Sequence, residues 1–248
     1  MSVISAAAIL NQKHMSLALL VLAVCLSLLI LVYRTHRIPR YVFRKLLHIV
    51  AFSIVSVMLA FADSWISVCI ASVIIVAALY PLLKWFSRKS YFSDFFVEKE
   101  PGEVLMSFVM LFTMLSIVCA IGWGAFGRRD LAISAILMWG VGDAAAALVG
   151  IPFGKHKARI SIHLGSRTIE LTDGKKSVEG SIANCAAAAL SGFAVMMLCS
   201  LPFASALLLA VLGGAASALT ELVTPSEYDT FSVPIAVLAV LLIFSRIM

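Results

Sequence analysis

Eight long apolar stretches dominate this chain of 248 residues and leave few folds open to it. A helix needs about 20 mostly apolar residues to cross a bilayer, and helices satisfy their backbone polar groups where lipid cannot. With 62% hydrophobic and 13% charged residues, the chain is predicted to be a single all-α integral membrane domain over residues 1–248. We expect a bundle of about eight transmembrane helices, approximately at Ser16–Val32, Leu46–Ala62, Trp65–Trp85, Val104–Ile121, Leu131–Val149, Val178–Leu198, Phe203–Val223 and Ser232–Ile247.

The basic residues divide unevenly between the two sides of this predicted bundle. Of the 19 lysines and arginines, only Lys13, Arg128, Arg129 and Arg246 fall on the side of the termini. Because Lys-rich and Arg-rich loops stay in the cytoplasm, we expect the connections between spans 1 and 2, 3 and 4, 5 and 6, and 7 and 8 inside, and both termini outside. Most of the acids lie on the same side, so we expect the chemistry at the cytoplasmic face. The compact length favours a bacterial inner membrane, or the endoplasmic reticulum if the source is eukaryotic.

The connection between the fifth and sixth spans contains two stretches with strand-like alternation. Arg159–Leu164 and Arg167–Thr172 each alternate polar and apolar residues, and Gly165-Ser166 separates them. A two-residue turn between alternating stretches predicts a β-hairpin. We therefore expect a small cytoplasmic hairpin that acts as a lid over the site or as a spacer.

An aspartate inside an apolar helix is the first candidate for function. Asp143 lies within Trp139–Gly150, a stretch that is otherwise apolar or glycine. An ionisable residue in a membrane helix is costly and indicates function by default. Asp143 either packs helices through a neighbouring cation or serves as general base or metal ligand, two roles that phosphoryl transfer assigns to carboxylates.

Two segments rich in glycine and lysine follow, Gly150–Lys157 and Asp173–Gly180. Glycine amides and ammonium groups together hold phosphate, and the N-terminus of the helix that starts near Ser177 favours anions. A basic anchor for anionic lipid headgroups is the alternative, and the Walker pattern is absent from the sequence. The candidate nucleotide-binding residues are Gly154, Lys155, His156, Lys157, Lys175, Lys176, Ser177, Glu179 and Gly180.

A basic cluster precedes the second span. Arg44 and His48 are four residues apart and share a helical face, with Lys45 beside them. This cluster either sets the topology or contacts the transferred phosphate or the acceptor hydroxyl. Glu103, before the fourth span, either complements the helix dipole or joins the site.

An acidic connection precedes the last span. The segment Glu221–Pro234 carries three acids, among them Glu221 and Asp229, and no basic residue. It is either a solvated turn or one side of a metal-bridged phosphate site, with the lysine-rich connection as the other side.

Together these segments resemble the CTP-dependent lipid-alcohol kinase family, which includes dolichol kinase, phytol kinase and the CTP-using diacylglycerol kinase. The resemblance spans roughly Arg44 to Pro234, and Tyr228–Pro234 is similar to the ending of the kinases except at Thr230, where their pattern often has asparagine. The matching residues are Arg44-Lys45 with His48, Gly142 to Ala146 with Gly150, Gly154 to Lys157, and Gly174 to Gly180. The last two segments are also similar to the CDP-diacylglycerol synthases, which use CTP too.

The resemblance implies a membrane kinase that transfers the γ-phosphate of CTP to the hydroxyl of a lipid alcohol, either an isoprenoid alcohol or diacylglycerol, with Mg²⁺. Residues 131–234 would form the nucleotide half. Three alternatives stay open: a phosphatidate cytidylyltransferase, a transporter and a lipid-binding protein, and no nucleic-acid partner is expected. The implied roles are catalysis for Asp143, His48 and Arg44, metal binding for Asp143, Glu179 and Asp229, and support for Lys45, Glu103 and Glu221.

Overall fold

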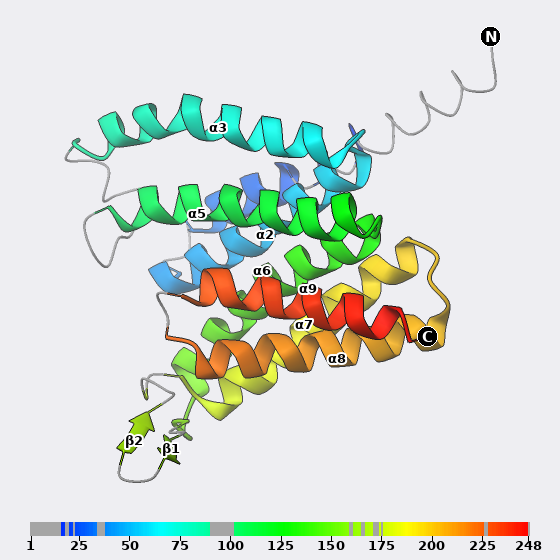
Figure 1. The fold of residues 1–248 in the computed structure, drawn as a ribbon. Coiled ribbons are helices and arrows are strands. Elements are labelled where there is room, and N and C mark those ends of the chain that lie inside the picture. The colour runs from blue at the N-terminus through cyan, green and yellow to red at the C-terminus, as the bar shows by residue number, and fades with distance from the viewer. Residues whose placement is uncertain are drawn as a thin grey trace.

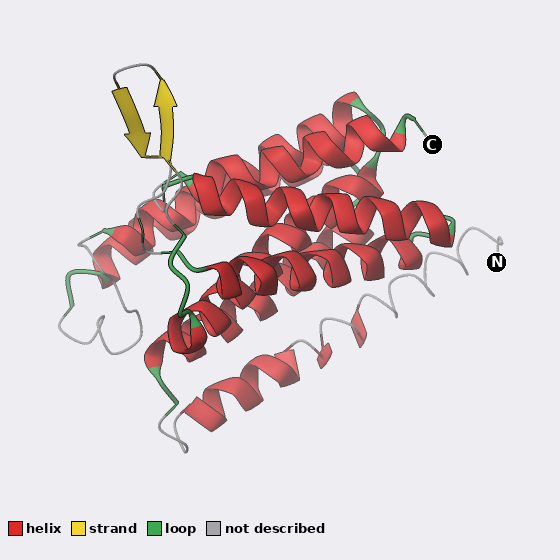
Figure 2. Ribbon diagram, turned by 90° about the horizontal axis from the view of Figure 1, so that it is seen from below, coloured by secondary structure: helices red, strands yellow, loops and turns green. Residues whose placement is uncertain are grey.

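The protein is a bundle of roughly parallel and antiparallel helices with one small two-stranded sheet at one end (Figures 1 and 2). The computed structural model describes residues 16–17, 20–21, 23–33, 38–89, 102–158, 161–164, 167–170, 174, 176–225 and 228–247. The helices are α2 (Arg40–Phe61), α3 (Trp65–Phe86), α5 (Glu103–Val118), α6 (Arg129–Phe153), α7 (Val178–Leu198), α8 (Phe203–Val223) and α9 (Asp229–Ser245). A π-helical segment, η1 (Cys119–Ala125), continues α5, and a helix Ala23–Tyr33 precedes α2.

Among the residues that the structure describes, six helices are long and apolar enough to cross a membrane, so the chain has the form of a multi-pass membrane protein. They are α2, α3, α5 with η1, α6, α7 and α8. The other two predicted spans appear, among the described residues, as the shorter apolar helices Ala23–Tyr33 and Asp229–Ser245. The 17 residues of α9 reach about 25 Å at 1.5 Å per residue, which is less than the roughly 30 Å of a hydrocarbon core.

The second predicted span begins six residues earlier than its apolar pattern suggested. Pro39 precedes the first turn of α2, which begins at Arg40, and Val42 and Phe43 donate backbone hydrogen bonds to the Pro39 carbonyl oxygen. Proline suits this place because its fixed φ is ready for a helix that starts beside it. As a result Arg44 and Lys45 lie on a helix instead of in a loop.

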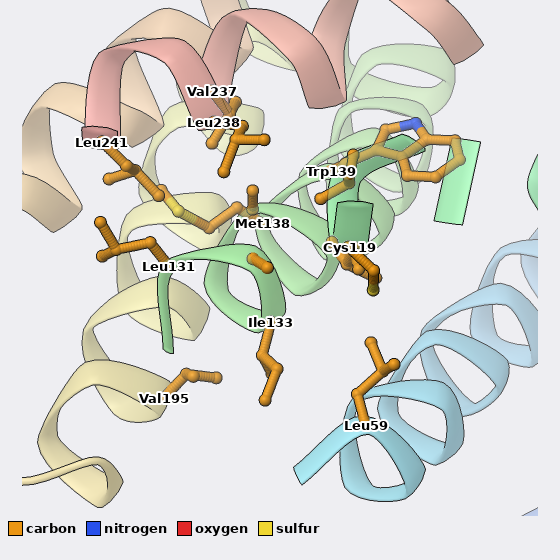
Figure 3. Close-up of a cluster of buried hydrophobic side chains, with 14 of the residues drawn as sticks. Leu59, Cys119, Leu131, Ile133, Met138, Trp139, Val195, Val237, Leu238 and Leu241 are labelled. Atoms are coloured by element: carbon orange, nitrogen blue, oxygen red, sulfur yellow. The ribbon is translucent and has the colours of Figure 1, made fainter. Parts of the chain in front are cut away.

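The core forms around α6, which packs against α2, α7, α8 and α9. Met138 of α6 is fully buried and directed toward Leu241 of α9 (Figure 3). Glycines make this close approach possible: a Cβ at Gly192 of α7 would lie 2.5 Å from the Met138 sulfur, and one at Gly213 of α8 would lie 2.6 Å from its Cε. Small residues thus bring α7 and α8 against α6, as is typical of helices packed in lipid. By contrast, α3 lies at the outside of the bundle (Figure 1).

Between α6 and α7, strand β1 (Ser161–Leu164) pairs antiparallel with β2 (Arg167–Glu170). Ser161 lies opposite Glu170, and Leu164 lies opposite Arg167. Both strands lie within the two stretches of alternating residues, and the pair projects from one end of the bundle (Figure 2). Residues 165–166, the predicted turn, lie outside the described residues.

Candidate functional site

Six helix ends meet around one cavity of about 740 Å³. The N-terminal turns of α2, α5, α7 and α9 border it together with the C-terminal turns of α6 and α8. Segments that are far apart in the sequence therefore converge at one end of the bundle. The polar and charged side chains on the cavity wall include Arg40, Arg44, Lys45, His48, Asp143, Lys157, Lys176, Asn184, Glu221 and Asp229.

Asp143 is held by two residues of α2. The Lys45 ammonium donates to the Asp143 Oδ2 atom at 2.7 Å, and the His48 Nε2 atom lies 3.5 Å from the same oxygen. Within the described chain, His48 Nε2 is shielded from solvent and has no hydrogen-bond partner. An unpaired buried polar atom is costly, and the nearest charged oxygen to this nitrogen is Asp143 Oδ2.

A glycine allows α2 to approach α6 this closely. A Cβ at Gly140 would lie 2.1 Å from Cγ of Phe52, so the ring occupies the space where a side chain would be. Phe52 is 2% exposed, lies 4.5 Å from the His48 ring, and meets Trp139 edge-on at 4.8 Å. Phe52 and Trp139 line the cavity together with Lys45 and His48.

A buried polar network holds Glu221 on the opposite wall. The Asn184 side-chain amide donates to Glu221 Oε2 at 2.5 Å, and the Ser217 hydroxyl donates to Asn184 Oδ1 at 2.7 Å. Asn184 is 1% exposed and Ser217 is fully buried. Gly142 leaves room for this network, because a Cβ there would lie 2.7 Å from Asn184 Oδ1. The sequence interpretation missed Asn184, although an amide within an apolar helix is a signal of function.

Lys176 joins the start of α7 to the end of α8. Its ammonium donates to the backbone oxygens of Glu221 and, at 2.7 Å, Thr224. It also lies 3.8 Å from Asp229 Oδ2. A cation at the last carbonyls of a helix is favoured by their partial negative charge. Lys176 therefore has a structural role at the cavity besides any role toward a ligand.

The predicted phosphate glycines pack around Ser177. Ser177 caps α7 by accepting a hydrogen bond from the Gly180 backbone N–H at 3.2 Å. A Cβ at Gly154 would lie 2.5 Å from the Ser177 hydroxyl, and one at Gly150 would lie 3.0 Å from it. Ser177 and Gly180 line the cavity, whereas Gly154 does not. Close packing of the end of α6 against the start of α7 thus explains why these positions are glycine, since a side chain there would meet Ser177.

The two basic segments lie side by side. Ala158 donates its backbone N–H to the Lys176 oxygen at 3.0 Å, and Val178 donates to the His156 oxygen at 2.9 Å. Lys157 lines the cavity, and Lys155 is exposed.

Glu179 lies away from the other predicted metal ligands. Its carboxylate accepts from the His156 backbone N–H at 3.2 Å and lies 2.7 Å from the Nδ1 atom of that histidine. Neither Glu179 nor His156 is on the cavity wall. The reason is helical geometry: Ser177, Gly180 and Asn184 face the cavity from one side of α7, and at 100° per residue position 179 lies on another side.

Two further candidates have no described side chain. Lys175 lies outside the described residues, and Glu103 begins α5 with a side chain that is not described. The structure therefore brings together Asp143, Glu221 and Asp229 as the carboxylates of the cavity wall.

This carboxylate set fits magnesium that is bound together with a phosphate. Among the described residues, no group of three or more His, Cys, Asp or Glu side chains is placed to hold a metal ion. Mg²⁺ needs no such cage, because it is commonly bound through one or two carboxylates and the phosphates of a substrate. Asp143, Glu221 and Asp229 supply oxygen donors of the kind that Mg²⁺ prefers. Their present side-chain partners are Lys45 for Asp143, Asn184 for Glu221 and Lys176 for Asp229.

No family model, curated protein or solved structure matches this chain.

Proposed function

We propose that this protein is a membrane kinase that transfers the γ-phosphate of CTP to the hydroxyl of a lipid alcohol. One observation carries the proposal: Asp143 lines a cavity whose wall combines cationic and acidic groups with apolar side chains. A lipid alcohol with a charged donor requires such a mixed site. The choice of CTP rests on the resemblance of Gly154–Lys157 and Gly174–Gly180 to CTP-using enzymes.

In this proposal Asp143 accepts the proton of the acceptor hydroxyl. The hydroxyl oxygen then forms a bond to the γ-phosphorus, the bond from that phosphorus to the bridging oxygen breaks, and CDP leaves with the electron pair. Lys45, 2.7 Å from the carboxylate, orients Asp143 and favours its ionised form. A positioned general base of this kind contributes roughly 10²- to 10⁴-fold to a rate.

The cations and acids of the cavity wall have separate tasks. Arg44, Lys157 and Lys176 lie where they can neutralise charge that develops on the phosphoryl oxygens. His48, through its unpaired Nε2 atom, can donate to a phosphate oxygen. Asp229 and Glu221 are the candidates to hold Mg²⁺, which when bound neutralises the phosphates and orients them.

The proposal includes the finer topology. Eight spans, with Ala23–Tyr33 and α9 as the first and last, place the cavity and β1–β2 at the cytoplasmic face, where the lysine-rich and arginine-rich connections favour the inside. The membrane would be a bacterial inner membrane, or the endoplasmic reticulum in a eukaryote.

The test is an assay of purified protein with γ-labelled CTP, Mg²⁺ and a panel of lipid alcohols. We expect label in the lipid and CDP as the second product. Release of pyrophosphate would instead identify a cytidylyltransferase, and the absence of any CTP turnover or binding would refute the proposal. Asp143→Asn should lower transfer by about 100-fold or more without loss of folding. Asp130→Asn is the matched control, because Asp130 lies at the far end of the same helix and pairs with Arg128.

A further inference from the structure

One wall of the cavity is an apolar stripe on α5. Val104, Ser107, Phe108 and Leu111 all border the cavity, and their spacing of three, four and seven residues places them on one helical face. Ser107 is exposed and the others are half-buried. This stripe extends from the first turn of α5 toward the middle of the helix.

A matching apolar stripe runs along α2. Phe43, Leu47 and Ala51 recur every four residues, border the cavity, and are half-buried. At 100° per residue they lie beside Arg44 and His48, with Lys45 further round the helix. The α2 helix therefore presents its polar side to Asp143 and its apolar side to the same cavity.

The two stripes border the cavity from helices that pack mainly on other partners. The α2 helix packs against α6, whereas α5 packs against α3, α9 and η1. Phe52 and Trp139 close the inner end, at 2% and 6% exposure. At the outer end Phe43 stacks on Tyr33 with ring centroids 4.1 Å apart. The result is an apolar seam, defined by Phe43, Leu47, Ala51, Val104, Phe108 and Leu111, that lines the same cavity as Asp143.

We propose that this seam between α2 and α5 binds the hydrocarbon chain of the acceptor and delivers its hydroxyl to Asp143. This inference rests on the proposed function, because that function is what identifies the polar end of the bound lipid as a hydroxyl. The seam has no charged side chain among the six that define it, so it suits a chain and not a headgroup. Lys157, Lys176 and the carboxylates Glu221 and Asp229 then face the nucleotide, and the two substrates meet at α6.

The first experiment detects occupancy without catalysis. Wild-type protein in detergent is irradiated with a long-chain alcohol that carries a diazirine in its chain, and the labelled peptides are mapped. We expect label in residues 41–52 and 104–111, with competition by the unlabelled alcohol. Label confined to α3, or not competed, would overturn the inference.

The second experiment narrows the seam. Ser107→Trp places a bulky ring on the exposed edge of the α5 stripe, and we expect the KM for the alcohol to rise about tenfold while the KM for CTP is unchanged. Met106→Trp is the control, because Met106 is 59% exposed at the same depth but is not on the cavity wall. An equal effect of both substitutions would contradict a role for the seam.

The experiments can refute the kinase proposal and the seam proposal independently of each other. Seam labelling without phosphoryl transfer to any alcohol would leave the lipid site in place and refute the kinase. Phosphoryl transfer with label elsewhere would retain the kinase and refute the seam.

Discussion

Replacing Gly140 by alanine tests whether the contact between α2 and α6 positions Asp143. The added Cβ would lie 2.1 Å from Cγ and 2.7 Å from Cβ of Phe52, whereas carbon atoms meet at roughly 3.5–4.0 Å. Rotation of the Phe52 ring moves the ring atoms but not the Phe52 Cβ atom, so it cannot relieve the contact between that atom and the new methyl group. The backbones of α2 and α6 must therefore separate. A shift of α2 away from α6 by about 1.5 Å restores the contact distance. The same shift lengthens the distance between the Lys45 ammonium and the Asp143 carboxylate from 2.7 Å to roughly 4 Å.

We expect two effects of Gly140→Ala. Overpacking of this kind costs about 1–3 kcal/mol, which thermal unfolding in detergent can measure. Since misplacement by about 1 Å can lower a rate by roughly 100-fold, the turnover of lipid alcohol should fall much more than the stability loss explains.

The double variant Gly140→Ala with Phe52→Ala is the control. Phe52→Ala alone leaves a cavity and costs about 3–5 kcal/mol, but it removes the ring atoms that the new methyl group would meet. The loss of stability in the double variant should therefore be smaller than the sum of the losses in the two single variants. Unchanged melting temperature and turnover in Gly140→Ala would refute the reasoning, because they would show that the helices do not depend on this contact.

Three further predictions follow from the site. Asn184→Ala leaves the Glu221 carboxylate and the Ser217 hydroxyl without their buried partner, so it should lower the free energy of unfolding by about 1–3 kcal/mol, more than Ser191→Ala on the same helix, as measured by chemical denaturation. Ser177→Ala removes the cap of α7 and should cost about 1 kcal/mol, seen as a lower melting temperature; a variant as stable as the parent would show that the cap is dispensable. Removal of Mg²⁺ by EDTA should abolish phosphoryl transfer but leave the melting temperature of the nucleotide-free protein unchanged, and a large drop in that temperature would indicate a resident structural metal instead.

Much of the fold follows from the length of the apolar stretches. The bounds of the helices Val178–Leu198 and Phe203–Val223 agree with the sequence prediction because their charged residues, Glu179 and Glu221, lie near a helix end and leave the apolar stretch between unbroken. The start of α2 was placed too late, since Arg44 and Lys45 ended the apolar pattern although Pro39 begins the helix. Charged residues that face a polar cavity thus end an apolar pattern although they belong to the helix.

The site was predictable in part. Asp143 carries its own signal, an acid among apolar residues, but its partner Lys45 is 98 positions away in the sequence and only the fold brings them together. Periodicity along α7 would have placed Glu179 off the face of Gly180 and Asn184, and would have selected the asparagine. The prediction for Glu179 rests on its closeness in sequence to the lysine motif. Closeness in sequence does not decide which way a helical side chain points.

The packing around Ser177 has a mechanical consequence. With Gly150, Gly154 and Gly180 in contact around one hydroxyl, α6 and α7 have no slack at their junction and move as a stiff unit. If the protein is the kinase proposed above, we expect the movement that admits a substrate to occur at α2 and α5. Asp143 on α6 would then keep its place relative to α7, whereas Lys45 and His48 on α2 would move with the opening.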